Sequence, residues 1–576
     1  MMSENRGVAL LFLAAAAACG GGGDDADQED AGDDADSSTP DSGEPDGAGP
    51  DAGAPPGTDV SGFAFGIEYV EYFPALQELG QRVADAYDDF GGGAAKNTYL
   101  SWGTVEPGPP EGEVHDYRWT VPDGLVELWQ SKGFSTITFV LGAAGSNRAA
   151  AFWGVESFPS EDCDANAGAS RSPLPEHLED YRDFVRAIVE RYDGDGEDDM
   201  PGLGAPVRRF EIETEAQHLG FWQGDANPDG EPCPDFPGSE CCRILPDGEM
   251  PAYAELLRAA HSAAREASED AIIILAGLTF GDMFDDFPSD DVVEERSSSM
   301  SLIERQAHNI QYLVSLVDAY DEIELHLLDH YTGLVGIAGN VRGALEELGV
   351  DKPIWIGDSM SADAFFKSFG FALQIEEAQE RNWLYEALTD EGHTDHGLVE
   401  PWYRAEQARY SVKTALVAME LGLGGAHYYG VTDVPLFWER DWQYQGLVDL
   451  EMGFGTIEGE GTPRPVYDAL RALRTAVADK PFLSRLDLGD ADVWAYRLLP
   501  GDGGPATTVL WLESSYVAPA ETPPSADVDL PVGSASAFVR PIPTERGIEP
   551  QGEQLDAEGG VIHLAVTPTP IFVEEQ

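Results

Sequence analysis

Three glutamates stand two residues apart in the stretch FEIETE, and a fourth carboxylate ends the apolar run KPIWIGD. Glu211, Glu213 and Glu215 follow Arg209 at alternate positions, and the fourth acid is Asp358. Successive side chains of a β-strand point to opposite faces, so the three glutamates should share one face with Arg209, a possible partner for Glu211. A buried carboxyl group beside another carboxylate has a raised pKa and tends to keep its proton. This spacing therefore predicts a general acid at Glu215.

The elements that would position these acids form a repeating pattern. From residue 62, eight short apolar runs alternate with eight helix-like stretches. Strands that alternate with helices require a parallel sheet, and eight units fit a closed (β/α)8 barrel better than an open sheet. The pattern predicts an α/β fold with a (β/α)8 (TIM) barrel over residues 59–479. Short alternating runs separated by Gly and Pro then predict a small all-β sandwich over residues 480–576.

In such a barrel the run with the glutamates is strand four and the run with Asp358 is strand seven. The alternation aligns Asp358 with Ile354 and Ile356 at the C-terminal end of its strand. Strands four and seven lie on opposite sides of an eight-stranded barrel, so Glu215 and Asp358 should face each other across the mouth. Two opposed carboxyl groups, one protonated and one ionised, are the groups that cleave a glycosidic bond.

Several motifs resemble those of clan A glycoside hydrolases in order and spacing. YLSWGTVEPGPPEGEVHDYRW resembles their second-strand region, FEIETEAQ...FW their strand four motif E-I-W-N-E-P-N, and KPIWIGDSM their strand seven motif. TPRPVYDALRAL resembles the close of their barrel, and the ending TPTPIFVEE resembles the domain that follows it. The resemblance covers residues 62–576 and implies O-glycoside hydrolysis of an oligo- or polysaccharide with no catalytic cofactor.

Carried over residue by residue, the resemblance assigns Glu215 to the acid/base position and Asp358 to the nucleophile position. It also places His330 and Tyr331 beside the nucleophile. Two positions depart from the family pattern: Thr214 and Glu213 stand where the family keeps Asn and Trp. Glu213 is either an acid behind the site or a substrate contact.

The family nucleophile is Glu, and Asp358 is shorter by one carbon–carbon bond of about 1.5 Å. Retaining enzymes hold their carboxyl groups about 5–5.5 Å apart, and inverting enzymes about 6.5–9.5 Å apart. The shorter acid weakens a covalent mechanism, moves the chemistry toward inversion, or marks a catalytically inactive barrel that only binds carbohydrate.

Aromatic residues in the expected mouth loops are candidates for stacking on sugar rings. These residues are Trp153, Trp222, Trp438 and Trp442, and Trp102 of the motif YLSWGTVEPG is a further substrate-binding candidate. The alternative is that these rings pack under the long loops.

The N-terminus reads as an export signal followed by a tether. Residues 1–19 combine Arg6, an apolar run too short to span a membrane and small residues before Cys19. This segment resembles a bacterial lipoprotein signal, which implies lipidation of Cys19 and attachment to the cell envelope, in the outer membrane or at the cell surface. An ordinary signal peptide is the alternative. Residues 20–58 are rich in Gly, Asp, Ala and Pro and should form a disordered acidic linker.

Four further cysteines, Cys163, Cys233, Cys241 and Cys242, are an even number in an exported chain. They favour one or two disulfides, most simply from Cys163 to one of the adjacent pair and from Cys233 to the other.

An acidic loop, YDGDGEDDMPG, offers a possible structural calcium site. Asp193, Asp195, Glu197 and Asp199 alternate along it with glycines between some of them, and such oxygen ligands suit Ca²⁺. A solvated acidic turn is the alternative.

The charge of the chain excludes one class of partner. Lys and Arg number 33 against 106 Asp and Glu, which gives a formal net charge of −73. Such a chain repels phosphate backbones and anionic lipid surfaces, so we expect no nucleic-acid partner and contact with a membrane only through the N-terminal lipid.

Overall fold

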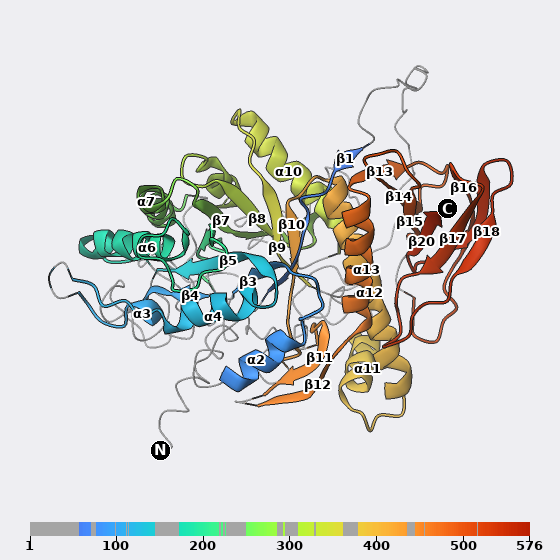
Figure 1. Cartoon of the computed structure of the whole chain (residues 1–576), viewed down its shortest axis with the longest axis horizontal. Helices are drawn as coiled ribbons and strands as arrows, with labels where there is room; N and C mark the ends of the chain where they lie inside the picture. The colour runs from blue at the N-terminus through green and yellow to red at the C-terminus, as the bar shows by residue number, and fades with distance from the viewer. Residues whose placement is uncertain are drawn as a thin grey trace, which may run out of the picture.

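The chain folds into a closed parallel β-barrel followed by an antiparallel β-sandwich (Figure 1). The computed structural model describes residues 57–68, 70, 77–97, 99–110, 112, 114–143, 172–217, 221–222, 225, 249–284, 292–293, 309–327, 330–360, 378–434, 444–453, 456–514 and 517–576. The expected signal, Cys19 and nearly all of the expected linker lie outside these ranges.

Eight parallel strands close the barrel, as the alternating pattern predicts. β10 pairs with both β9 and β2, and β3 pairs with both β2 and β5, so the sheet closes on itself. The strands are β2 (Ala64–Glu68), β3 (Gly93–Lys96), β5 (Phe134–Gly142), β6 (Arg209–Ile212), β7 (Ile272–Thr279), β8 (Glu322–Leu327), β9 (Ile354–Ser359) and β10 (Gly425–Tyr428), with the short β4 (Leu100–Ser101) paired at the end of β5.

Helices surround the barrel because each strand is followed by an amphipathic stretch. Helix α7 shows how the local sequence fixes these elements: it begins at Pro251, whose φ suits a first helical position, and the Asp225 carboxylate accepts hydrogen bonds from the amides of Ala252 and Tyr253. The helices are α2 (Gln77–Asp85), α3 (Trp102–Val105), α4 (Thr120–Gln130), η4 (Pro175–His177), α6 (Leu178–Tyr192), α7 (Pro251–Ala267), η5 (Gly281–Phe284), α10 (Gly333–Glu347), α11 (Ala378–Thr389), α12 (His396–Glu420) and α13 (Pro465–Asp479).

The C-terminal unit contains one large sheet and one two-stranded ribbon. The large sheet has the order β1 (Thr58–Asp59), β13 (Phe482–Leu486), β14 (Val493–Leu499), β15 (Thr507–Leu512), β20 (Ile571–Glu575), β17 (Ser536–Pro541) and β18 (Glu553–Asp556). The ribbon pairs β16 (Ala526–Pro531) with β19 (Val561–Val566). β1 joins this sheet, so Thr58, which we assigned to the linker, is in a paired strand. A separate hairpin, β11 (Val448–Met452) and β12 (Ile457–Pro463), precedes α13.

Helices α12 and α13 lie between the barrel and the sandwich (Figure 1). Trp494 and Trp511 of the sandwich belong to the same apolar cluster as the barrel helices. Tyr496 donates a hydrogen bond to Glu420 at the end of α12 at 2.6 Å. The two units therefore share a continuous core.

No helix in the described ranges is both long enough and apolar enough to cross a membrane.

Candidate active site

A buried group of charged side chains fills the barrel from its centre to its mouth. Its members come from five different strands, most of them near the C-terminal ends or just after them: Glu68, Lys96, Glu211, Glu215, Glu324, His326 and Asp358. The C-terminal ends of barrel strands form the functional face of this fold. Glu211 and Glu324 are 0% exposed, while Glu215 and Asp358 are 8% and 6% exposed. Glu215 and Asp358 are thus the acids of this group that reach furthest toward solvent.

Lys96 holds the centre of this group. Its Nζ lies 2.7 Å from Glu211, 2.7 Å from Glu324 and 3.9 Å from Glu68. Burial by itself would lower the pKa of Lys96, but these carboxylates raise it well above its usual value, so the ammonium stays charged. Lys96 is the main counter-charge for the acids around it.

The neighbouring acids respond differently to Lys96. Burial raises the pKa of Glu211 to about 7, although Lys96 opposes this rise. Burial would also raise the pKa of Glu324, but the positive charges of Lys96, His427 and Arg209 hold it below its usual value. The centre of the barrel therefore pairs an ionised Glu324 with a Glu211 that titrates near neutral pH.

Arg209 has a different partner from the one we expected. Its guanidinium pairs with Glu322 and Glu324 of β8 and lies 3.9 Å from the ring centroid of Trp355. Glu211 pairs with Lys96 instead. The prediction of an Arg209–Glu211 pair was wrong because the alternation places residues on a face without saying which neighbouring strand supplies the counter-charge.

The three glutamates of FEIETE do not share one face. β6 ends at Ile212, and Glu213 and Glu215 have φ values of 60° and 43°, so the backbone turns out of the extended conformation. The Glu213 carboxylate accepts hydrogen bonds from the Tyr99 hydroxyl and the Ala143 amide, both at 2.7 Å. The alternation therefore holds for Arg209 and Glu211 and fails beyond Ile212.

Glu215 meets His326 of β8. His326 Nδ1 lies 2.8 Å from Glu215 Oε1. Burial alone would lower the pKa of His326, but the hydrogen bond and the negative charge of Glu215 raise it above its usual value. The approach of His326 also explains a glycine inside β7, because a Cβ on Gly277 would lie 1.8 Å from His326 Nε2.

Asp358 reaches the barrel interior through an irregularity in β9. In the register with β8, Leu325 pairs with Ile356 and His326 pairs with Asp358, so Gly357 is an extra residue. Gly357 faces Glu324, since a Cβ there would lie 2.0 Å from its carboxylate, and Trp355 faces Arg209. Ile354 and Ile356 therefore point outward, and the bulge turns Asp358 inward. The expected alignment of Asp358 with these two isoleucines was wrong, although its place at the strand end agrees.

Glu68, the last residue of β2, is hydrogen-bonded to Asp358. Burial and the negative charge of Asp358 raise the pKa of Glu68 well above its usual value. Burial also raises the pKa of Asp358, while His326 and the hydrogen bond from Glu68 oppose the rise. Glu68 is thus the proton donor of this pair and Asp358 the acceptor.

Sequence reasoning missed Glu68, Lys96 and His326. Each of them is a titratable residue at or near the end of a short, largely apolar barrel strand, in the runs AFGIE, GAAK and EIELHL. A charged residue at the C-terminal end of a barrel strand is a signal for function. This signal was available in the sequence for all three.

Within the described part of the chain, two groups of side chains have the ligand types of metal sites. Glu211, Glu324 and His326 converge, but Lys96 Nζ already lies 2.7 Å from both carboxylates, so a cation there would compete with it. In the acidic loop Asp193, Asp195 and Asp199 come together, while Glu197 is not part of the group. Their carboxylates also accept hydrogen bonds from amides of their own loop.

Two of the aromatic candidates, Trp102 and Trp222, lie inside the core. Trp102 and Trp222 are 0% exposed, and their indole nitrogens donate to Glu106 and Asp225 at 2.9 Å. Neither ring has an exposed face for a sugar, which corrects our expectation for both. Thr214 is half-buried.

His330 and Tyr331 face the sandwich. The Tyr331 hydroxyl donates to Glu513, and its ring lies 6.1 Å from that of Trp494. Both residues line a pocket beside the sandwich, whereas His326 of β8 is the residue that pairs with Asp358 in the strand register.

The remaining candidates fall outside the described residues. These are Trp153, Trp438, Trp442, Cys163, Cys233, Cys241 and Cys242.

Comparison with known proteins identifies the architecture. No family model and no curated protein matches this sequence. A glucosidase from Croceicoccus marinus has a TM-score of 0.52 at 11% identity, covering 90% of this chain and 97% of that one. The GH39 enzyme from Xanthomonas axonopodis pv. citri has a TM-score of 0.51 at 12% identity, covering 90% of this chain and 96% of that one. At such identities the likeness shows a shared fold, the (β/α)8 barrel followed by a β-sandwich.

Proposed function

We propose that this chain is a glycoside hydrolase that uses Glu215 as acid/base and Asp358 as nucleophile or base. The observation that carries the proposal is that both acids are neighbours of His326: Glu215 Oε1 lies 2.8 Å from its Nδ1, and Asp358 pairs with it in the register of β8 and β9. The glycosidases that share the fold support carbohydrate as the substrate class.

Glu215 suits protonation of the leaving group, and Asp358 suits the attack on the anomeric carbon. The His326 imidazolium, whose Nδ1 lies 2.8 Å from Glu215, supplies Glu215 with the proton that passes to the leaving oxygen as the glycosidic C–O bond breaks. Asp358, which accepts the hydrogen bond of Glu68, then either forms an ester bond to the anomeric carbon or removes a proton from the attacking water. In the first case water later cleaves the ester and returns a proton to Glu215. Glu68 and His326 position the two acids.

Substitution of the acid tests the proposal. Glu215→Gln keeps the shape of the side chain and removes the transferable proton, so kcat on a panel of aryl glycosides should fall by about 10²–10⁴-fold. Asp358→Asn should cause a comparable loss. Glu545→Gln, in an exposed loop of the sandwich, is the control and should keep full activity. Unchanged turnover in Glu215→Gln would refute the assignment, and NMR of the first product anomer separates retention from inversion.

The second candidate is a barrel that binds carbohydrate without cleaving it. The observation that favours it is Asp358, whose side chain is shorter than the Glu that the resemblance implies. Saccharide binding by the wild type, with no turnover on the whole panel, would support this candidate. Turnover that is lost in Glu215→Gln while binding remains would exclude it.

We further propose attachment to the cell envelope through a lipid on Cys19. Cys19→Ser should then move the protein from the membrane fraction to the soluble fraction, and an unchanged distribution would contradict the anchor. The disulfides among Cys163, Cys233, Cys241 and Cys242 are tested by peptide mapping without reduction, where only free thiols would contradict them.

Structural calcium in the acidic loop remains a proposal as well. If Asp193, Asp195 and Asp199 bind Ca²⁺, millimolar Ca²⁺ should raise the Tm and Asp195→Asn should weaken the effect. An equal Tm with Ca²⁺ and with chelator would argue against it.

A further inference from the structure

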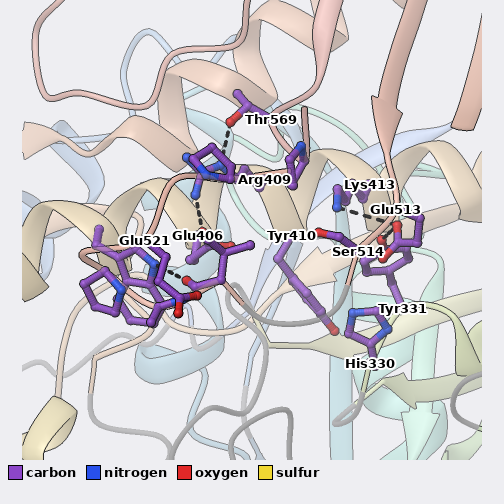
Figure 2. A pocket seen from close by; sticks show the side chains of 16 residues that line it. His330, Tyr331, Glu406, Arg409, Tyr410, Lys413, Glu513, Ser514, Glu521 and Thr569 are labelled. Atoms are coloured by element: carbon purple, nitrogen blue, oxygen red, sulfur yellow. Dashed lines mark hydrogen bonds and ion pairs between the residues drawn. The ribbon is translucent and has the colours of Figure 1, made fainter. Parts of the chain in front are cut away.

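A pocket lies between the barrel and the sandwich, lined by helix α12 and by residues of both units (Figure 2). Its walls come from helix α12, from His330 and Tyr331 after β8, and from sandwich residues within 513–514, 517–523 and 568–569. Neither Glu215 nor Asp358 lines it. The cavity of ≈ 200 Å³ is smaller than the pockets of about 300–1,000 Å³ that take drug-sized ligands. It therefore suits a molecule the size of one sugar ring.

The two long basic side chains that line this pocket, Arg409 and Lys413, are already paired with carboxylates. Arg409 pairs with Glu406 and donates to Thr569 Oγ1 at 2.8 Å, and Lys413 lies 3.6 Å from Glu513. Glu521 adds a further carboxylate to the lining. The pocket thus has no surplus of positive charge for a phosphate or carboxylate ligand. A hydroxyl group suits it better, because a hydroxyl both donates to a carboxylate and accepts from a guanidinium.

Aromatic rings supply the rest of the wall. In Figure 2 the ring of Tyr410 stands between Glu406 on one side and His330 on the other. Tyr410 lies 5.9 Å from Tyr331 and 6.4 Å from His330, and Trp402 also lines the pocket. Ring faces pack against the C–H faces of a pyranose, while polar groups at the edge bind its hydroxyls.

One polar atom in the lining has no partner. Among the residues that the structure describes, Ser514 Oγ is buried and makes no hydrogen bond. A buried hydroxyl without a partner has a cost in free energy. A ligand hydroxyl in the adjacent cavity would satisfy it.

We propose that this pocket binds one neutral sugar unit at a non-catalytic site, with Trp402, Glu406 and Tyr410 as its main contacts. The sugar is either a unit of a longer chain or a free monosaccharide. A site of this kind holds carbohydrate beside the barrel whether or not the barrel cleaves it, so the proposal does not depend on turnover.

Titration calorimetry of the full chain carrying Glu215→Gln tests this site with methyl glycosides of neutral hexoses and pentoses, and with the matching oligosaccharides. The probes should bind saturably. Glu406→Ala or Trp402→Ala should weaken that binding by about tenfold or more, because each removes a charged acceptor or a stacking face. The control is Glu545→Ala, an exposed glutamate in another loop of the sandwich, which should change nothing. Far-UV circular dichroism and the Tm verify that each variant is folded.

The two sources of the sugar give different patterns. If the oligosaccharide binds more tightly than the methyl glycoside, and Glu406→Ala abolishes this difference, the pocket holds one unit of a longer chain. If the two probes bind with equal affinity, the pocket holds a free monosaccharide. No binding of any probe, or binding that Glu406→Ala and Trp402→Ala leave unchanged, would overturn the proposal. Turnover of a small aryl glycoside in the Glu406→Ala variant of the otherwise native chain should stay at the native level. If the native chain turns over glycosides but the pocket binds no sugar, the pocket proposal fails and the hydrolase proposal stands. If the pocket binds sugar but the native chain shows no turnover, the hydrolase proposal fails and the pocket proposal stands.

Discussion

The barrel interior and the sandwich core are both buried, but they are built from different side chains. The barrel centre contains Lys96, Glu211 and Glu324, each 0% exposed. The sandwich core is a cluster of aliphatic residues, and the buried polar side chains in its described part are Thr507 and Thr508. Burial of apolar surface stabilises a fold, whereas buried ion pairs are often no better than apolar residues of the same size. Stability explains the aliphatic sandwich core, while the charged barrel centre fits the hydrolysis that we propose for its mouth.

The largest expected effect in this comparison comes from removing the central cation. Lys96→Met leaves Glu211, Glu324 and Glu68 without their main counter-charge, so we expect the free energy of unfolding to fall by about 3–5 kcal/mol. Urea denaturation measures the loss. Lys132→Met is the control, because its partners Asp85 and Asp88 are exposed and the pair should contribute about 0–1 kcal/mol. Equal losses of unfolding free energy in the two variants would mean that the buried ion pairs of Lys96 contribute no more to stability than the exposed pairs of Lys132.

A cavity in the sandwich core should cost somewhat less. Leu530→Ala removes a buried side chain that packs among aliphatic neighbours, and we expect a loss of about 2–5 kcal/mol. The cost should be the same at acidic and neutral pH because no titratable group of the described residues lies in that cluster. If the stability lost in Leu530→Ala varied with pH, the sandwich core would also depend on titratable groups, and the contrast with the barrel centre would be wrong.

A methyl group on Gly277 should disturb the site more than the fold. Its Cβ would lie 1.8 Å from His326 Nε2 and push the imidazole from Glu215. We expect a stability loss of about 1–3 kcal/mol from overpacking together with a loss of kcat. Gly339→Ala, in helix α10 with open space around its Cβ, is the control and should keep its activity. Full activity in Gly277→Ala would show that His326 does not position Glu215.

The smallest expected effect is a change in the pH dependence of stability. The pKa of Glu211 is about 7 in the folded chain against an ordinary value of 4.5. Below pH 4.5 both states hold this proton, and between 4.5 and 7 only the folded state does, so this contribution to stability is lost as the pH rises. The raised pKa of His326 acts in the same direction. In Glu211→Gln, the free energy of unfolding should therefore fall less between about pH 5 and about pH 7.5 than in the native chain. If urea denaturation showed the same dependence of this free energy on pH in both proteins, the raised pKa of Glu211 would be contradicted.

Much of the fold could be predicted because its signals are local. The run IIILAGLT of β7 is almost wholly apolar, as expected for a strand covered on both faces, and strand and helix patterns follow each other eight times. The same reasoning placed Glu215 at the end of strand four and Asp358 at the end of strand seven, although β6 ends at Ile212 and Glu215 follows it. It failed where the backbone departs from regular geometry, at the positive φ of Glu213 and Glu215 and at the bulge of Gly357.

The sequence by itself determined the order of the elements, the barrel and the sandwich, because helical and strand periodicity depend only on residues close together in the chain. Only the tertiary structure decided which acidic and basic side chains pair with each other. Lys96 and Glu324 are 228 positions apart, and Glu215 and His326 are 111 positions apart. Strand pairing brings such residues together, and a single extra residue in β9 turns Asp358 toward them. Counter-charges and side-chain direction depend on register across the closed sheet, which no local pattern specifies.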